Sequence, residues 1–198
     1  MKYIFYITGK SASGKDSVYR ALLEDERLKL SPIILHTTRP MRDGEAEGRE
    51  YHFVDEDTYQ TMKKHGDVIE CRTYETVHGP WRYFTASSAV ENSMDYYLGI
   101  GTLESYTGMK EHFGRDCLIP VYIELEDGDR LMRAIEREKL SGKPDYKEMC
   151  RRYLADDDDF SEEKLLEAGI KEGNRFENEN LADCTDGIRS MIIGYQGK

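Results

Sequence analysis

The chain has 198 residues, 34% of them charged, and its formal net charge at neutral pH is −11. This length suffices for one domain with a buried core and small inserted subdomains. The excess negative charge disfavours duplex nucleic acid as a partner, because binding would need a local basic patch acting against the overall field.

The sequence contains no apolar run of membrane-spanning length, and its first residues do not form a secretory signal. We therefore expect a cytoplasmic protein without a membrane partner. The four cysteines lie far apart without a C-x-x-C pair, and the five histidines form no H-E-x-x-H pair. These spacings predict reduced thiols, without a zinc site or a disulfide framework.

The first predicted elements are a strand at residues 4–7 and a helix from about Lys15 to Glu26, joined by a glycine-rich loop. This loop has the spacing G-x-x-x-x-G-K, in which backbone N–H groups, a lysine and a helix N-terminus surround phosphate oxygens. Asp16 stands where a Ser or Thr hydroxyl normally reaches Mg²⁺, and Ser17 follows it. The candidate phosphate-binding residues are Gly9, Ser11, Ala12, Ser13, Gly14, Lys15, Asp16 and Ser17.

Short strands and turns between residues 36 and 93 predict a compact insertion into the surrounding alternation of strands and helices. A polar turn at 36–44 holds Arg39 and Arg42, which suit bidentate binding of a phosphate. The predicted elements, in order, are a strand at 33–35, a strand at 51–54, a helix at 56–65 with Asp55 and Gly66 as caps, and a strand at 67–74 with Glu70.

Regular alternation returns after residue 94 and predicts an α/β fold with a mainly parallel sheet, helices on both faces and ligands at the carboxyl ends of its strands. The first predicted elements of this part are a strand at 96–100, a helix at 103–113 ended by Gly114 and a strand at 118–125. A helix from 127 or 128 follows, then a break at 141–144 and a helix capped by Asp145 and Glu148. The last predicted elements are a helix through 168, a strand at 175–176 and a helix near 188. We expect a core of residues 1–35, 94–136 and 157–198, with a helical lid at 137–156.

Arginines mark this lid and its approach. Arg133 and Arg137 share one helix face, and Arg152 lies on the next helix. We expect the acidic run at 156–159 to be solvated, because successive helical residues point around the axis. A phosphate loop, an insertion with Arg39 and Tyr51, and a lid with arginines together predict phosphoryl transfer between two anions, which needs cations, alignment and exclusion of water.

The segment HTTRPMRDGE at 36–45, followed by GREYHFV at 48–54, resembles the acceptor segment of the guanylate kinases, a family of P-loop nucleoside monophosphate kinases. The resemblance runs from Tyr3 to about Asn180. It implies a P-loop kinase with a three-layer parallel core, an acceptor-binding insertion at 36–93 and a lid. It also implies transfer of phosphate from ATP, with Mg²⁺, to GMP.

The same resemblance implies roles for individual residues. Arg39, Arg42 and Tyr51 would hold the phosphate of GMP, and Glu70 would accept hydrogen bonds from guanine, whose two adjacent donors adenine lacks. Thr38, Tyr83 and Thr85 would complete the acceptor contacts, and Asn178 would lie against the adenine of ATP. The implied catalytic residues are Lys15, Arg39, Arg133, Arg137 and Arg152.

The chain departs from the family pattern at four places. Leu35 replaces a serine that contacts guanine, and Gly99 and Gly101 replace two aspartates at the end of the central strand. Asp16 replaces the metal-binding hydroxyl, and a carboxylate there suits Mg²⁺. The fourth departure is extra length between Glu70 and Tyr83 and in the lid.

Two other functions fit parts of the sequence. The residues SGKDS at 13–17 also resemble the ribose 1,5-bisphosphate phosphokinases, which explains Asp16 and the missing aspartates but not Glu70 or the acceptor segment. A guanylate-kinase-like binding module without activity is the second alternative. Retention of Lys15 and of the lid arginines favours an enzyme over a binding module.

Overall fold

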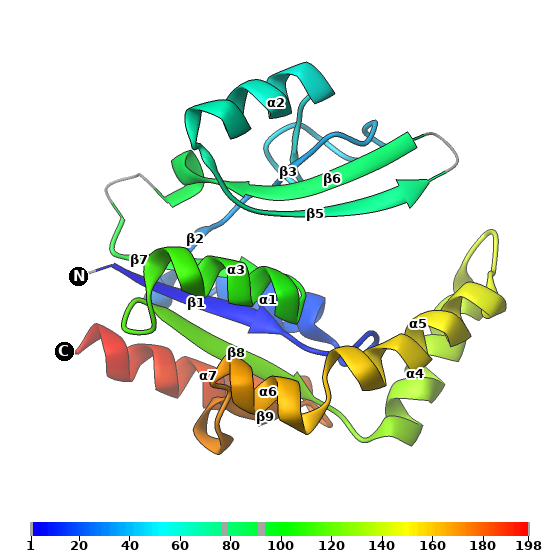
Figure 1. Cartoon of the computed structure of the whole chain (residues 1–198). Coiled ribbons are helices and arrows are strands. Elements are labelled where there is room, and N and C mark those ends of the chain that lie inside the picture. Colours follow the sequence, from blue (N-terminus) through cyan, green and yellow to red (C-terminus); the bar gives the residue numbers. More distant parts are fainter. Residues whose placement is uncertain (1, 77–78, 91–93, 198) are drawn as a thin grey trace.

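The computed structural model describes residues 2–76, 79–90 and 94–197. Its core is a parallel five-stranded sheet that corresponds to the predicted α/β fold (Figure 1). The strand order is β2 (Ser31–Pro32), β7 (Tyr96–Ile100), β1 (Tyr3–Thr8), β8 (Leu118–Glu124) and β9 (Arg175–Glu177).

Helices cover both faces of this sheet, so its strands are apolar on both sides. Alternate residues of β1 enter two separate clusters. Phe5 and Ile7 pack against α1 (Lys15–Leu23) and α7 (Leu181–Gln196). Ile4 and Tyr6 pack against α3 (Leu103–Phe113) and α6 (Glu162–Ala168). The carboxyl end of β1 thereby holds the glycine-rich loop at the edge where ligands of such sheets bind.

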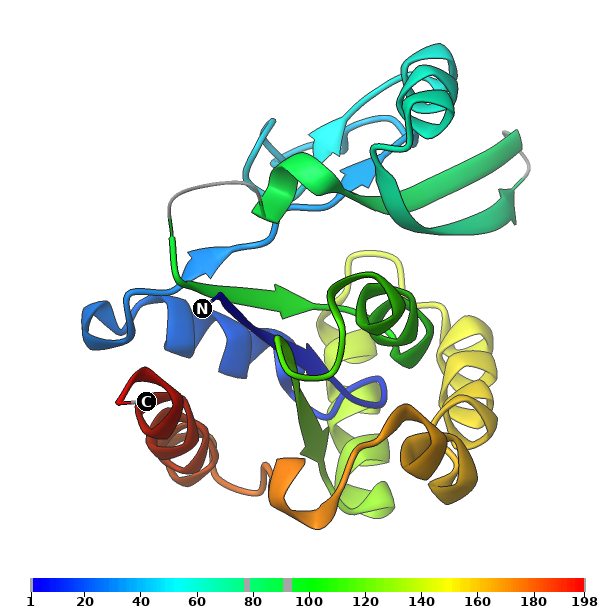
Figure 2. The same ribbon diagram turned by 60° about the vertical axis from the view of Figure 1, so that its left-hand side comes forward.

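A second sheet forms a separate layer above the core (Figures 1 and 2). Its strand order is β4 (His52–Phe53), β3 (His36–Thr37), β6 (Gly79–Ala86) and β5 (Val68–Thr76), and α2 (Glu56–His65) packs nearby. Asp55 caps α2 by accepting the Thr58 N–H at 2.8 Å, and Gly66 ends it in a left-handed conformation, as the sequence predicts. The expected end of this insertion, Ser93, lies outside the described residues.

The prediction of a strand at 33–35 is wrong, because this run connects the two sheets. The Ile33 N–H donates to the Leu98 carbonyl of the core at 2.9 Å. Two residues later, the Leu35 carbonyl accepts the His52 N–H of the second sheet at 2.8 Å. A short strand and a buried connection can have the same apolar composition, so composition alone does not distinguish them.

Two helices, α4 (Asp127–Leu140) and α5 (Tyr146–Asp159), project beside the core (Figure 2). Asp145 caps α5 by accepting the Glu148 N–H at 2.9 Å. Short 3-10 turns complete the elements: η1 (Glu26–Leu28), η2 (Ser87–Val90) and η3 (Glu172–Asn174). Within the described residues, no helix has both the length and the apolar character that crossing a bilayer requires.

Candidate functional site

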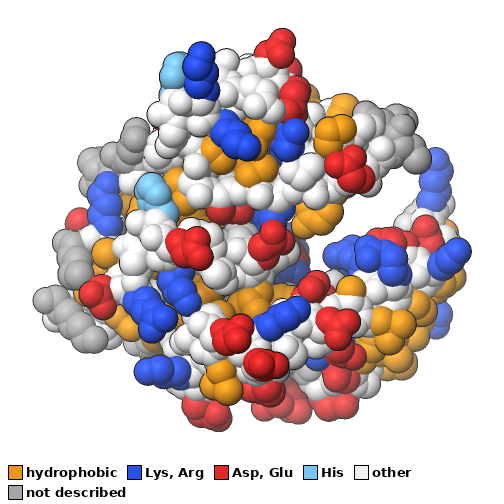
Figure 3. Space-filling view, viewed as in Figure 1, with side chains coloured by type: hydrophobic (Ala, Val, Ile, Leu, Met, Phe, Trp, Pro, Cys, Tyr) orange, Lys and Arg blue, Asp and Glu red, His pale blue; other side chains and the backbone are white. Residues whose placement is uncertain are grey.

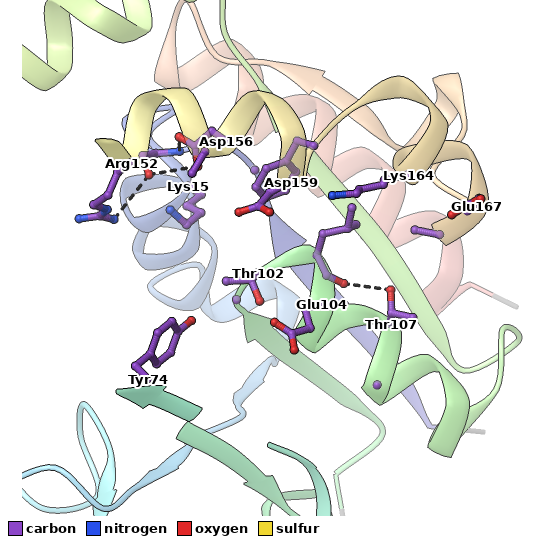
Figure 4. Close-up of a pocket in the computed structure, with 18 of the residues that line it drawn as sticks. Lys15, Tyr74, Thr102, Glu104, Thr107, Arg152, Asp156, Asp159, Lys164 and Glu167 are labelled. Carbon is purple, nitrogen blue, oxygen red and sulfur yellow. Dashed lines mark hydrogen bonds between the residues drawn. The ribbon is translucent and has the colours of Figure 1, made fainter. Parts of the chain in front are cut away.

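A cavity of about 860 Å³ lies where the glycine-rich loop, the second sheet and the projecting helices meet. Figure 3 shows a hollow between the upper layer and the projecting helices, and Figure 4 shows side chains from these parts directed toward it. Lys15 reaches the cavity from α1, Tyr74 from β5, Thr102 and Glu104 from the region after β7, and Arg152 from α5. The cavity thus joins segments that are far apart in sequence.

The glycine-rich loop needs glycine at its last turn. Gly14 has φ of 88°, and a Cβ there would lie 2.3 Å from Asn178 Nδ2. That amide donates to the Ser13 carbonyl at 2.8 Å, and Asn178 is only 2% exposed. The structure therefore places Asn178 beneath the phosphate loop, where it fixes the loop backbone.

The acidic run is not uniformly solvated, which corrects the expectation from sequence. Asp156 is 8% exposed, and its carboxylate accepts the Ser11 backbone N–H of the loop at 2.8 Å. Asp157 is exposed but pairs with Lys10 at 2.8 Å. Helical periodicity correctly predicts that the Asp156 side chain points in a different direction from its neighbours. It does not predict that the partner of Asp156 is Ser11, 145 residues away.

Arg130 is a residue that the sequence reasoning missed. It is fully buried in α4, donates to Asp156 at 3.0 Å and to Asp127 at 3.0 Å, and lies over the Tyr153 ring at 3.9 Å. It therefore joins α4, α5 and the loop. The i, i+3 pair with Asp127 was the available sequence signal, but such pairs are common on exposed helices.

The three predicted lid arginines occupy different surroundings. Arg133 donates to the backbone carbonyls of Asn178 at 2.9 Å and Glu179 at 3.2 Å. Arg152 is exposed, lines the cavity and approaches the Ser11 hydroxyl at 3.5 Å. Arg137 is exposed beside a small groove between α4 and α5. Among the three, Arg152 alone lines the main cavity.

Arg39 is the centre of the predicted phosphate-binding group in the second sheet. Its side chain is 3% exposed and makes a two-pronged ion pair with Glu45, at 2.6 and 2.7 Å. Its Nε donates to the Tyr83 hydroxyl at 3.2 Å, and its guanidinium lies over the Tyr51 ring at 5.0 Å. Hydrogen bonding with Glu45 raises the pKa of Arg39 and lowers that of Glu45 to about 2.

Other predicted acceptor residues divide between this sheet's interior and its rim. The Thr38 hydroxyl is used within the sheet, where it accepts the Arg82 N–H at 3.0 Å. Arg42 is exposed at the rim. Glu70 lies beside α3, its side chain only 6% exposed, and accepts the Thr85 hydroxyl at 2.7 Å. The structure therefore brings together Arg39, Tyr51 and Tyr83, and separately Glu70 and Thr85.

Tyr6 occupies the space beside the two glycines that end β7. A Cβ on Gly99 would lie 2.7 Å from its ring, and one on Gly101 would lie 2.2 Å from its hydroxyl. That hydroxyl is fixed by a hydrogen bond of 2.6 Å with Ser105. Opposite, Asp16 extends from the first turn of α1 with its side chain 79% exposed, 3.8 Å from Lys15 Nζ.

The glycine-rich loop at the end of β1, the parallel sheet and the added second sheet define a P-loop kinase fold. The crystal structure of guanylate kinase from Anaplasma phagocytophilum matches it with a TM-score of 0.68, covering 100% of this chain and 87% of that one at 18% sequence identity.

Sequence comparison finds guanylate kinases among the proteins similar to this chain. The guanylate kinase family model matches residues 2–94. A guanylate kinase of Methylobacillus flagellatus is 44% identical over 92 residues, which cover 46% of this chain and 43% of that protein. A guanylate kinase of Pseudomonas syringae pv. syringae is 28% identical over 181 residues, which cover 80% and 81%. The chain is thus similar to guanylate kinases, most strongly over residues 2–94, and its match to the first of these relatives spans less than half the length of that protein.

Proposed function

We propose that the protein transfers the terminal phosphate of ATP to GMP, forming ADP and GDP. The observation that supports this most directly is the shared cavity, which is lined by Lys15 of the phosphate loop and by Tyr74 of the second sheet. A donor held by the loop and an acceptor held by the sheet would meet there. The similarity of residues 2–94 to guanylate kinases supports the choice of nucleotides.

On the acceptor side, Arg39, Tyr51 and Tyr83 are proposed to hold the phosphate of GMP, with Arg42 closing over it from the rim. Glu70 would accept hydrogen bonds from the guanine N1–H and amino group. Its carboxylate has acceptor capacity beyond the Thr85 hydroxyl, because an ionised carboxylate offers about four lone-pair directions. This pairing would select guanine over adenine.

On the donor side, the loop N–H groups and Lys15 would bind the phosphates of ATP. Arg152, which lines the cavity, is proposed to neutralise charge on the transferred group. Arg133 and Asn178 would act by fixing the wall of the donor site, since both bond to backbone carbonyls there. Closure of α5 over the cavity would exclude water.

Asp16 is the proposed protein contact for Mg²⁺. Magnesium bound to a nucleotide needs only one or two protein carboxylates, because phosphates and water supply its other ligands. The exposed Asp16 carboxylate beside Lys15 suits that need. The ion would neutralise charge on the phosphates. We expect the enzyme in the cytoplasm, where its nucleotide substrates are found.

Turnover of an acceptor panel tests this function. The full chain with MgATP is offered GMP, dGMP, AMP or ribose 1,5-bisphosphate, and ADP release is measured. We expect turnover with GMP and its absence with AMP. If only the sugar bisphosphate is turned over, that compound and not GMP is the acceptor. If none of the four compounds is turned over, a binding module is favoured. Lys15→Met serves as the control for contaminating kinases, because it should abolish ADP release.

A further inference from the structure

Arg72 lies in the middle of the acceptor-facing surface of β5. Alternate residues of this strand share a face, and Glu70, Arg72 and Tyr74 face the core, since Glu70 abuts Gly108 of α3 and Tyr74 lines the cavity. Arg72 pairs in register with Tyr83 of β6. It is therefore placed between the proposed guanine contact, Glu70, and the phosphate-binding group around Tyr83.

The Arg72 side chain is buried without a full set of partners. It is 8% exposed, and its Nη1 donates to the Thr102 hydroxyl at a long 3.5 Å. Its Nε forms an ion pair with Glu70 at 3.4 Å, without hydrogen-bond geometry. Among the described residues, neither Nε nor Nη2 has a hydrogen-bond partner. Leaving buried donors of a charged group unsatisfied costs free energy. The Nε–Nη2 edge of Arg72 is therefore suited to a hydrogen-bond acceptor on a bound ligand.

Two neighbouring arginines differ from Arg72 in that they donate hydrogen bonds to carboxylates. Arg39 uses its guanidinium on Glu45, Tyr83 and the Pro40 carbonyl. Arg82 lies on the opposite face of the sheet, where it pairs with Glu56 at 2.9 Å and donates to Thr73. Arg72 is thus the buried arginine of this sheet that retains an unused two-donor edge.

The surroundings of Arg72 favour an anion. Thr102, which accepts from Arg72, and Tyr74, two residues along the same strand face, both line the cavity. The carboxylates near Arg72 are those of Glu70 and Glu104, whereas the nearby end of β7 carries Gly99 and Gly101, with Tyr6 filling the adjacent space, and adds none. The Nε–Nη2 edge of a guanidinium matches two oxygens of a phosphate. We propose that Arg72 is an acceptor-binding residue that donates from this edge to the phosphate of the acceptor.

This inference rests on the proposed function, because the phosphate is taken to be that of GMP. It is tested by calorimetric titration of the full chain with GMP and with guanosine, which lacks the phosphate. We expect Arg72→Met to weaken GMP binding roughly 10- to 100-fold, as loss of charged hydrogen bonds predicts, and to leave guanosine binding unchanged. Arg72→Lys should weaken GMP binding less, since it keeps the charge but loses the two-donor edge.

Arg115→Met is the matched control, because Arg115 is exposed between α3 and β8 and its loss changes the net charge equally. It should leave both affinities unchanged. Unchanged GMP binding in Arg72→Met, or parallel losses for GMP and guanosine, would overturn the inference. Thermal melting identifies an unfolded variant, in which case Arg72→Lys decides by the same two comparisons.

Failure of the proposed function has a different signature. If the wild-type chain binds neither GMP nor guanosine, the GMP assignment fails, and the same variants are titrated with ribose 5-phosphate and ribose. Weaker binding of ribose 5-phosphate alone in Arg72→Met would then support the role of Arg72. Equal binding by wild type and variant, or no binding of this phosphate by the wild type, would overturn it.

Discussion

At the scale of single residues, Tyr6 determines what the end of β7 can carry. A Cβ on Gly101 would lie 2.2 Å from the Tyr6 hydroxyl, which Ser105 holds in place. We expect Gly101→Ala to lower the free energy of unfolding by about 1–3 kcal/mol, the usual cost of overpacking a core. Urea denaturation measures this. Gly142→Ala is the control, since its Cβ meets nothing within 4 Å, and an equal loss there would contradict the explanation.

The proposed role of Asp16 in binding Mg²⁺ can be tested through the metal dependence of turnover. We expect Asp16→Ala to raise the Mg²⁺ concentration for half-maximal turnover roughly tenfold or more, since even outer contacts to a metal have effects of that size. The same variant should weaken Mn²⁺ binding in the presence of ATP, measured by electron paramagnetic resonance. Asp116→Ala removes an exposed carboxylate between α3 and β8 and should change neither. Unaltered metal dependence in Asp16→Ala would contradict the assignment.

His36 predicts a pH dependence of stability in the second sheet. Burial, with a smaller effect of neighbouring His52, lowers the pKa of His36 from 6.5 to about 4, while Glu47 opposes the shift. Between these values the unfolded chain binds a proton that the folded chain does not, so stability falls as pH drops from 6.5 to about 4. Urea denaturation at pH 7 and pH 5 should show a smaller loss for His36→Phe than for wild type. His112→Asn, at an exposed site, should match the wild type.

At the scale of elements, one buried arginine fixes the projecting helices to the phosphate loop. We expect Arg130→Met to lower the free energy of unfolding by about 3–5 kcal/mol, because it leaves the buried Asp156 without its partner. The same helix pair offers a control in Arg151→Met. Arg151 also pairs with a carboxylate, Glu148 at 2.7 Å, but on an exposed surface, so its loss should have little effect. Similar losses for both variants would show that burial is not the cause.

Local sequence signals predicted most elements because they act within a few residues. The helix at 103–113 ends at Gly114 as expected, and Asp55 and Asp145 cap the helices that they precede. Contacts that join distant segments had no such signal. The run at 33–35 became a connection between sheets, and Asp156 became a partner of the loop. Local sequence did not predict the surroundings of Arg72 either, because they depend on the pairing of β5 with β6 and on Thr102 of the core.

At the scale of the whole molecule, the second sheet and the α4–α5 pair stand on different sides of the cavity (Figure 1). If ligands draw them together, both nucleotides should be needed for full closure. We expect slower amide hydrogen exchange in α5 with GMP plus a non-hydrolysable ATP analogue than with either alone. Helix α7, which packs on the far side of the core sheet, should be unaffected. Equal exchange in α5 under all conditions would argue against a closing lid.

The contact between Tyr6 and the two glycines also limits which substitutions the chain can accept. The family resemblance places aspartates at positions 99 and 101, but either side chain would now collide with the ring or hydroxyl of a fully buried tyrosine. An aspartate at either position therefore requires a smaller residue at position 6. The residue at position 6 and the residues at positions 99 and 101 therefore depend on one another, and a β7 strand with these carboxylates is incompatible with Tyr6 in its present position.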